Sequence, residues 1–188
     1  MTTITLNPAL TGQYQLDPIH SRLGFVARHV MVTKVHGAFA TFEATACLDA
    51  DTPSSSTVRV SIDVASVETG NQMRDEHLRS NDFLDAAAFP QITFVSTAVD
   101  HIGAGTFQVT GDLTIKGVTR PVTIDLEYNG SAVDAQGAER VGFEGKAVIN
   151  RTDFGVSFNA VLETGGVMIS EKITLEFDIS AVKVALVS

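Results

Sequence analysis

Apolar and polar residues alternate with a period of two in several parts of this chain, most regularly near its C-terminal end. From Ile173 to Ala181 every second residue is apolar, and polar or charged residues stand between them. Residues 58–64, 107–116 and 122–128 follow the same pattern. Successive side chains of a β-strand point to opposite faces of its sheet. Each segment is therefore predicted to be a strand with one buried face and one solvated face.

Further strands are predicted in the rest of the chain, mostly separated by short turns that contain Gly, Asn or Asp. They cover residues 14–17, 23–30, 37–49, 91–99, 141–149 and 155–162. The predicted fold is therefore all-β, with about eight to ten antiparallel strands. Such a sheet has to close into a barrel or stack as a sandwich to remove its open edges. Alternation alone does not distinguish these two architectures.

The length of 188 residues suits one domain with a sizeable core. We expect residues 1–188 to form a single domain in which residues 1–13 are a flexible N-terminal extension. This extension contains no Lys or Arg and no long apolar run. It does not resemble a secretion signal, so a cytoplasmic location is expected. No stretch approaches the roughly 20 apolar residues that a membrane helix requires, and stable membrane insertion is not expected.

One charged segment, residues 71–85, interrupts the strand pattern and is predicted to be a short helix. Asn71 is a suitable N-cap residue. Arg74 and His77 are three positions apart and fall on one helix face, while Asp75 and Arg79 are spaced as an i, i+4 ion pair. The simplest interpretation is a solvated helix held by local ion pairs. The alternative places its cations at the mouth of a barrel.

Three motifs follow one another along the chain: NQMRDEHLRSNDFLDAAAFPQITF at residues 71–94, GDLTIKGVTRPVTIDLEY at 111–128 and INRTDFGVSF at 149–158. Near the N-terminus, Asp17, His20 and Ser21 are followed by Phe25 and the pair Arg28 and His29. Together these residues resemble the YceI-like family of lipocalin-like polyisoprenoid-binding proteins. The resemblance implies an antiparallel up-and-down β-barrel of about eight strands with a short helix in the long connection. It also implies an isoprenoid lipid as ligand and a homodimer.

The inward strand faces are mostly aliphatic or Phe, and these side chains either fill the core or line a cavity. Small residues along one face of residues 37–49, including Ala44 and Ala46, favour room for a rod-shaped apolar guest. The predicted cavity residues all sit among apolar neighbours on alternating strands. They are Phe25, Phe42, Val60, Ile62, Phe94, Leu113, Ile124 and Phe143.

The polar head group of such a ligand is predicted to lie at one barrel mouth beside Arg74 and His77, assisted by His29. Arginine suits this role because its planar fork can bind two oxygens together. For His29, a structural hydrogen bond to a carboxylate is the favoured alternative, and His20 carries the same alternatives. Residues 150–153 are predicted to form a tight turn without a ligand role, since Asn and Asp side chains bond their own backbone.

A net charge of −9, with only 13 Lys and Arg, makes nucleic acid an improbable partner. No motif of a nucleophilic, phosphate-binding or metal-dependent enzyme is present, so no catalytic residue, metal or cofactor is expected. The predicted function is non-catalytic binding, sequestration or transport of a polyprenyl pyrophosphate or an isoprenoid quinone. Two alternatives remain open: a small-molecule enzyme that uses His and carboxylates at the mouth, and a structural interaction module with a filled core.

Overall fold

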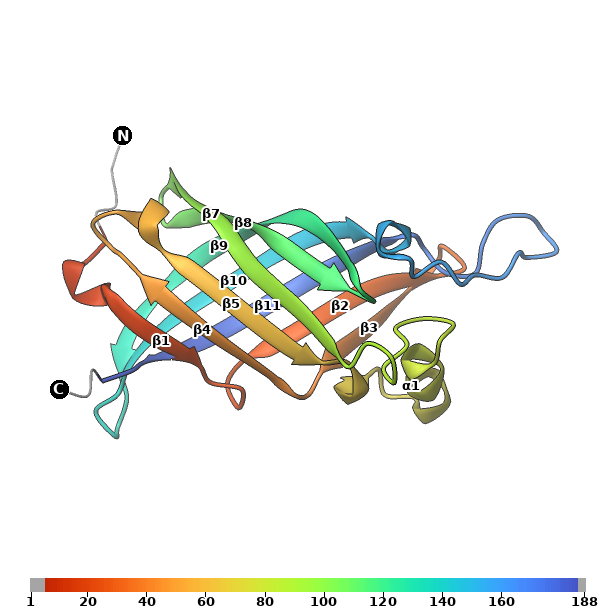
Figure 1. The fold of residues 1–188 in the computed structure, drawn as a ribbon, viewed down its shortest axis with the longest axis horizontal. Coiled ribbons are helices and arrows are strands. Elements are labelled where there is room, and N and C mark those ends of the chain that lie inside the picture. The colour runs from red at the N-terminus through yellow and green to blue at the C-terminus, as the bar shows by residue number, and fades with distance from the viewer. Residues whose placement is uncertain (1–5, 186–188) are drawn as a thin grey trace.

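Eight antiparallel strands form a closed barrel in the computed structural model, which describes residues 6–185 (Figure 1). In ring order they are β1 (Gly12–Leu16), β4 (Phe42–Leu48), β5 (Thr57–Asp63), β7 (Gln91–Gly103), β8 (Thr106–Ile115), β9 (Val118–Val133), β10 (Glu139–Asn150) and β11 (Lys172–Lys183). Pairing of Tyr14 in β1 with Lys183 in β11 closes the ring. The predicted barrel is confirmed, and its closure removes the open edges of the sheet.

Three more strands extend the sheet beyond this ring: β2 (Arg22–His29), β3 (Thr33–Phe39) and β6 (Val67–Glu68). β2 pairs with the first half of β11, where Phe25 lies opposite Leu175. β1 pairs with the last residues of the same strand. β1 and β2 therefore follow one another along β11, and β3 continues the sheet beside β2.

The prediction of one strand over residues 37–49 is wrong, because the chain bends at Ala40 and Thr41. Their backbone N–H groups donate to Ser66, at 3.1 Å to its carbonyl oxygen and 3.0 Å to its hydroxyl. These bonds withdraw both donors from strand pairing. The segment consequently divides into β3 and β4.

The prediction of a strand over residues 155–162 is also wrong. Apart from a bridge between Val161 and Val167, this segment is irregular. The Arg151 side chain donates to the carbonyl oxygens of Val156 and Phe158, which a strand ladder would otherwise use. Hydrogen bonds from the side chain of an arginine just before this segment thus replace strand pairing here.

The long connection before β7 carries the helix α1 (Gln72–Arg79), as predicted. The Asn71 side chain caps it by accepting from the Arg74 N–H at 3.0 Å. The helix is shorter than the expected residues 71–85 because the Ser80 hydroxyl donates to the His77 carbonyl and the chain turns. Short 3₁₀ turns occur at η1 (Pro8–Leu10), η2 (Pro53–Ser55), η3 (Val64–Ser66) and η4 (Arg151–Phe154).

Part of the expected N-terminal extension belongs to the barrel. Of residues 1–13, the first five lie outside the described residues. β1 already begins at Gly12 and pairs with β4. Leu10 packs against the core cluster around Tyr14, whose hydroxyl donates to the Leu10 carbonyl at 2.9 Å. Leu10 therefore contributes to the barrel interior rather than to a separate tail.

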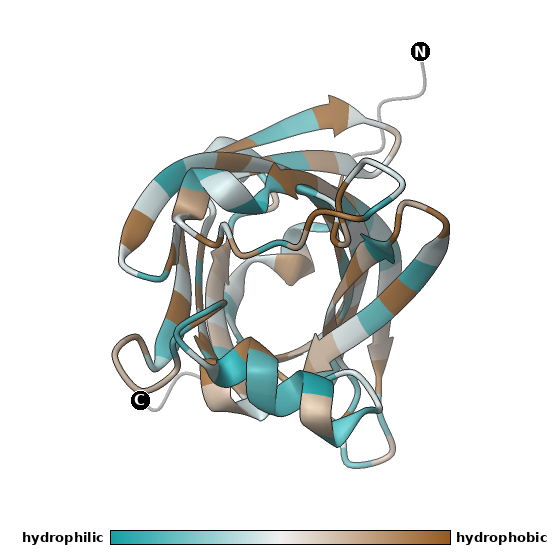
Figure 2. Ribbon diagram, turned by 90° about the vertical axis from the view of Figure 1, so that its right-hand side faces the viewer, coloured by the Kyte–Doolittle hydropathy of each residue, from teal (hydrophilic) through white to brown (hydrophobic). Residues whose placement is uncertain are grey.

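The two ends of the barrel differ in what surrounds them (Figure 1). The helix end carries α1, η4, the β2–β3 hairpin tip and the irregular residues 156–170. The terminal end carries both chain termini and the β7–β8 and β9–β10 hairpin tips. Viewed from the helix end, α1 lies along one side of the rim and the strands ring the centre (Figure 2).

Candidate ligand-binding site

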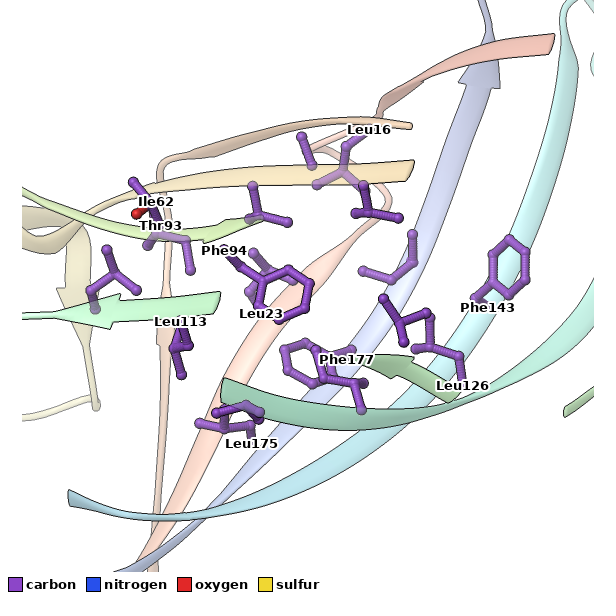
Figure 3. Close-up of a pocket in the computed structure, with 18 of the residues that line it drawn as sticks. Leu16, Leu23, Ile62, Thr93, Phe94, Leu113, Leu126, Phe143, Leu175 and Phe177 are labelled. Atoms are coloured by element: carbon purple, nitrogen blue, oxygen red, sulfur yellow. The ribbon is translucent and has the colours of Figure 1, made fainter. Parts of the chain in front are cut away.

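An apolar cavity of about 350 Å³ occupies the inside of the barrel (Figure 3). Every strand of the closed ring contributes to its wall. The lining extends from Leu10 and Ala50 at the terminal end to Phe83 and Phe154 at the helix end. This volume lies within the range of small-ligand pockets. The structure therefore does not have the filled core that was one alternative from the sequence.

Seven of the eight predicted cavity residues lie against this space. They are Phe25, Val60, Ile62, Phe94, Leu113, Ile124 and Phe143. Phe42 does not line it, although it shares a strand face with Ala44 and Ala46, which do. Phe42 is the first residue of β4, and its ring is buried against Leu16 and Leu23. Binding of a ligand by any of these residues stays a prediction.

The sequence analysis missed much of the wall on β1 and β11, including Leu16, Leu175 and Phe177. The alternation of residues 173–181 already indicated one buried face on β11. What it did not reveal is that this face borders an empty space, because that depends on how far the opposite wall lies across the ring. Alternation along a strand predicts which side chains point inward. Whether a cavity remains between them depends on the width of the barrel.

Two glycines, Gly37 and Gly111, each make room for a phenylalanine ring of the adjacent strand. A Cβ atom on Gly37 would lie 2.2 Å from the Phe25 ring, and one on Gly111 would lie 2.5 Å from the Phe94 ring. Each ring therefore lies across a glycine of the adjacent strand. Glycine inside a strand is the sequence signal for such a close approach.

Arg151 is the only cationic side chain among the cavity-lining residues in the described range 6–185. It is 5% exposed and stands in η4, directly after β10. Its Nε donates to the Ser170 carbonyl at 2.9 Å, and one terminal nitrogen donates to Val156 and Phe158 at 2.7 and 2.9 Å. The other terminal nitrogen has only a 3.4 Å contact with the Ile169 carbonyl. One NH₂ group is therefore the least satisfied donor of this side chain.

Carbonyl dipoles, rather than a carboxylate, surround the Arg151 charge. No ion pair of Arg151 occurs within residues 6–185. Burial lowers the pKa of the guanidinium, against a smaller opposing effect of Glu171. The group nonetheless stays protonated, because arginine titrates far above neutral pH. The sequence analysis assigned this motif to a turn, and Asn150 does cap it by accepting from the Thr152 N–H at 3.0 Å.

The predicted head-group residues lie at the helix end but do not line the cavity. Arg74 is exposed and donates to the Thr69 hydroxyl at 2.7 Å and the Thr69 carbonyl at 2.9 Å. His77 bonds Asp82 at 2.8 Å, and its ring meets the Phe83 and Phe158 rings edge-on. His29 is exposed at the end of β2.

The expected ion pair between Asp75 and Arg79 is not formed. Asp75 is buried and accepts from the Thr69 hydroxyl at 2.6 Å. Arg79 instead donates to the carbonyl oxygens of Ala65 and Val67, at 2.7 and 2.8 Å. These bonds hold α1 against η3 and β6. The helix is thus fixed by contacts to the preceding segment rather than by ion pairs along its own surface.

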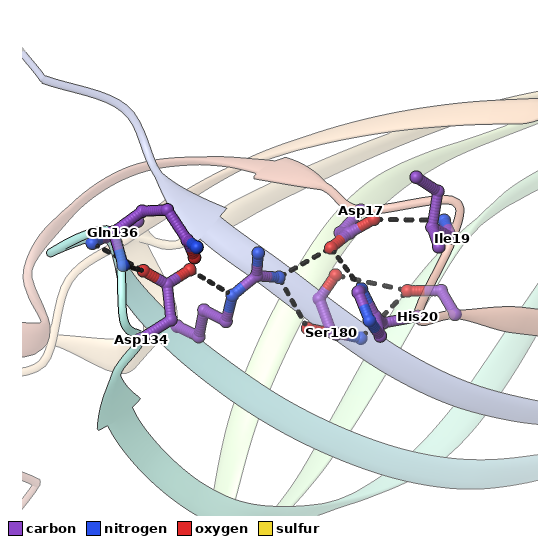
Figure 4. Close-up of polar contacts among 9 residues, drawn as sticks. Asp17, Ile19, His20, Asp134, Gln136 and Ser180 are labelled. Atoms are coloured by element: carbon purple, nitrogen blue, oxygen red, sulfur yellow. Dashed lines mark hydrogen bonds and ion pairs between the residues drawn. The ribbon is translucent and has the colours of Figure 1, made fainter.

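A polar network braces the outside of the terminal end (Figure 4). Arg140 donates to Asp17 and, at 2.7 Å, to Asp134. Asp17 also bonds His20 at 2.7 Å, which is the structural alternative considered for this histidine. Hydrogen bonds from Arg140 and then His20 hold the pKa of Asp17 far below its usual range. Arg140 likewise lowers the pKa of Asp134.

Asp17, His20 and Ser21 have the residue types of a catalytic triad but not its geometry. The Ser21 hydroxyl donates to the Ser180 carbonyl at 3.1 Å and accepts from the Ser180 N–H at 2.9 Å. Within residues 6–185 no hydrogen bond joins Ser21 to His20. This serine ties two strands together and is not activated by the histidine.

Among the described residues, no group of three or more His, Cys, Asp or Glu side chains is placed to hold a metal ion. In the same part of the chain, no helix has the length and apolar character needed to cross a bilayer.

Comparison with known proteins gives a family match over most of the chain. A family model described as the YceI-like domain matches residues 14–181. A UPF0312 protein of Pseudomonas savastanoi pv. phaseolicola is 38% identical over 155 residues, covering 81% of each chain. A UPF0312 protein of Staphylococcus aureus is 38% identical over 166 residues, covering 87% of this chain and 93% of the relative.

Solved structures share the barrel. BcnA of Burkholderia cenocepacia superimposes with a TM-score of 0.78 at 28% identity, over 88% of this chain and 98% of BcnA. The YceI protein of Campylobacter jejuni has a TM-score of 0.72 at 30% identity, over 84% and 90% of the two chains. A domain of Saccharophagus degradans described as polyisoprenoid binding has a TM-score of 0.64 over 91% and 98%. At 17% identity, this last likeness shows the fold alone.

Proposed function

The chain belongs to the YceI-like domain family, and from that premise we propose that it binds an amphiphilic isoprenoid lipid inside its barrel without transforming it. The observation that carries this proposal is the cavity of about 350 Å³, whose wall is almost wholly apolar from one end of the barrel to the other. Burying an isoprenoid tail there would gain about 25 cal/mol for each Å² of apolar surface removed from water.

The description of the Saccharophagus degradans domain as polyisoprenoid binding supports the same ligand class for this fold. Sequestration and transport both fit a closed barrel with no assembled catalytic group among its described residues. An uncharged isoprenoid quinone and a polyprenyl pyrophosphate share the tail and differ in the head group. The polar surroundings of the cavity bear on the choice between them.

We place the polar end of the ligand at the helix end. Arg151 is the cation that a head group inside the cavity would meet, and its second NH₂ group has donor capacity to spare. One partly free guanidinium can satisfy a quinone carbonyl. A buried pyrophosphate carries several charges and would need more cations to offset its desolvation. A quinone-like head therefore fits the interior better.

The alternative site for the head group is the rim outside the cavity, at Arg74, His77 and His29. A pyrophosphate head that stays outside the barrel would find these side chains around the helix-end rim. Arg74→Ala should then weaken a pyrophosphate ligand more than a quinone of equal tail length, because a charge-assisted hydrogen bond is about twice as strong as a neutral one. Equal losses of affinity for the two ligands would show that Arg74 contributes to the fold and not to head-group binding.

The test of the proposal is to fill the cavity. Ile62→Trp and Ile124→Trp each place a large ring in the space that the tail would occupy. Both variants should stay folded by circular dichroism yet lose binding of a long-chain quinone in a fluorescence or calorimetric titration. Val148→Trp is the matched control, because Val148 is 62% exposed on the outside of β10. Unchanged binding in both cavity variants would exclude the barrel interior as the site.

The homodimer implied by the family resemblance also stays a proposal. Analytical ultracentrifugation at micromolar concentration tests it, since a 20.0 kDa species alone would reject it.

A further inference from the structure

The β2–β3 hairpin tip at the helix end presents apolar side chains in an unfavourable backbone conformation. Its turn runs from His29 to Val32, whose N–H donates to the His29 carbonyl at 3.0 Å. The two central residues, Val30 and Met31, have φ of +45° and +60°. Left-handed backbone is strained for residues with a Cβ atom, and most of all for β-branched ones. Met31 and Val32 are nevertheless 55% and 72% exposed.

Two other hairpins of the same barrel show how such turns are usually built. The β7–β8 turn has Ala104 and Gly105 at its positive-φ positions, and the β8–β9 turn has Lys116 and Gly117. Glycine at the second position relieves the strain in both. The β2–β3 tip has no glycine at either central position. Its apolar residues are therefore not explained by the needs of the turn.

The hairpin also concentrates positive charge. Between residues 18 and 42 the chain has three cations, Arg22, Arg28 and Lys34, and no Asp or Glu, although its net charge is −9. Arg28 and Lys34 are direct cross-strand partners next to the tip. Like charges opposite one another destabilise a strand pair. Neither forms an ion pair within the described part of the chain. An external anionic surface would offset this repulsion.

The tip is joined to the part of the barrel end where the cavity stops. The Val30 N–H donates to the Met168 carbonyl at 2.7 Å, and His29 bridges to Ile169, which lines the cavity. Exposed apolar side chains flanked by cations are the features that bind proteins to the interface of anionic bilayers.

We propose that the helix end docks reversibly on an anionic bilayer, with Met31 and Val32 entering the head-group region and Arg28 and Lys34 facing lipid phosphates. Docking would set the helix end of the cavity against a source of lipid. That benefit rests on the proposed function, whereas the docking itself requires no ligand. The terminal end lacks this combination, because Asp100, Glu127 and Glu139 accompany its exposed Ile102 and Val133.

The chain contains no Trp, so one introduced Trp reports its own surroundings. Val32→Trp should shift its emission to the blue with vesicles that contain phosphatidylglycerol. Pure phosphatidylcholine vesicles, or high salt, should leave its emission unchanged. Val133→Trp is the matched control at the other end, because Val133 is 67% exposed and Val32 is 72% exposed. Equal shifts at both positions, or none at position 32, would overturn the proposal.

A second variant guards against misfolding. The double substitution Val30→Asn with Met31→Gly supplies the residues that this turn prefers. It should raise the thermal unfolding temperature and weaken vesicle binding about tenfold, since an apolar side chain and its partitioning are lost. Unchanged binding would contradict docking through the tip. All vesicles lack isoprenoids, and the isoprenoid content of the cavity is measured separately. A variant that no longer docks but still holds its isoprenoid would therefore leave the proposed function intact.

Discussion

The two ends of the barrel are closed by different physical means. At the terminal end, backbone pairing of β1 with β11 completes the ring, and Arg140 braces Asp17 and Asp134 outside it. At the helix end, arginine side chains donate to backbone carbonyls: Arg151 to residues 156–170, and Arg79 to Ala65 and Val67. Strand ladders are cooperative, whereas a few side-chain donors hold irregular backbone. We therefore expect the helix end to open more readily than the terminal end.

The charges of the two ends agree with this division of roles. The hairpin tips of the terminal end carry acidic residues, and the β2–β3 tip of the helix end carries cations. The cation that lines the cavity, Arg151, also belongs to the helix end. In the two proposals above, ligand entrance, head group and membrane contact all belong to the helix end.

The largest expected effect is a loss of stability at the helix end. Arg151→Met removes the donor of the buried Val156 and Ser170 carbonyl groups and of the part-buried Phe158 carbonyl, which should lower the free energy of unfolding by about 3 kcal/mol or more. Urea denaturation measures the loss. Hydrogen exchange should show reduced protection in residues 156–170 while β1 and β11 keep theirs.

Arg140→Met is the control at the terminal end. Its side chain is 29% exposed, so solvent replaces part of what it loses and the destabilisation should be smaller. An equal loss of unfolding free energy in the two arginine variants would contradict the proposed difference between the ends. Unchanged hydrogen exchange in residues 156–170 of Arg151→Met would contradict it too.

A smaller effect depends on pH and belongs to the terminal end. The pKa of folded Asp17 is depressed, so its stabilisation is fully present above the pKa of an unfolded Asp, about 3.9, and is lost as the pH falls through the folded value. Asp17→Asn should therefore melt at a lower temperature than the parent at pH 7. The difference should narrow below about pH 4.

Thermal melts between pH 2 and pH 8 check this dependence. The double variant Asp17→Asn with Arg140→Met should be less destabilised than the sum of the single variants, since both remove one network. A difference between Asp17→Asn and the parent that is the same at every pH would show that Asp17 does not stabilise the terminal end as a carboxylate.

The sequence predicted the parts of this molecule that local patterns control. Alternation along residues 173–181 predicted the inward face of β11, which lines the cavity, and the residue type of Asn71 identified the helix cap. The same reasoning placed seven of eight residues against the cavity, because a strand's period assigns every second side chain to one face.

The errors came from side-chain contacts to the backbone that strand alternation does not show. Ser66 divides the strand expected over residues 37–49, and Arg151 prevents one over residues 155–162. Arg151 was not recognised as a cavity residue because nothing local distinguishes a turn arginine from a buried one. Arg74 and His77, predicted to meet a head group, bond Thr69 and Asp82, since the sequence shows helix faces and not what lies beside them.

Native mass spectrometry of freshly purified protein tests the central claim, that the barrel cavity holds an isoprenoid lipid, most directly. We expect one lipid for each chain, identified by its mass as an isoprenoid with an uncharged quinone-like head, and its loss in Ile62→Trp and Ile124→Trp but not in Val148→Trp. A chain that carries no lipid, and takes up none when a long-chain quinone is added, would contradict it.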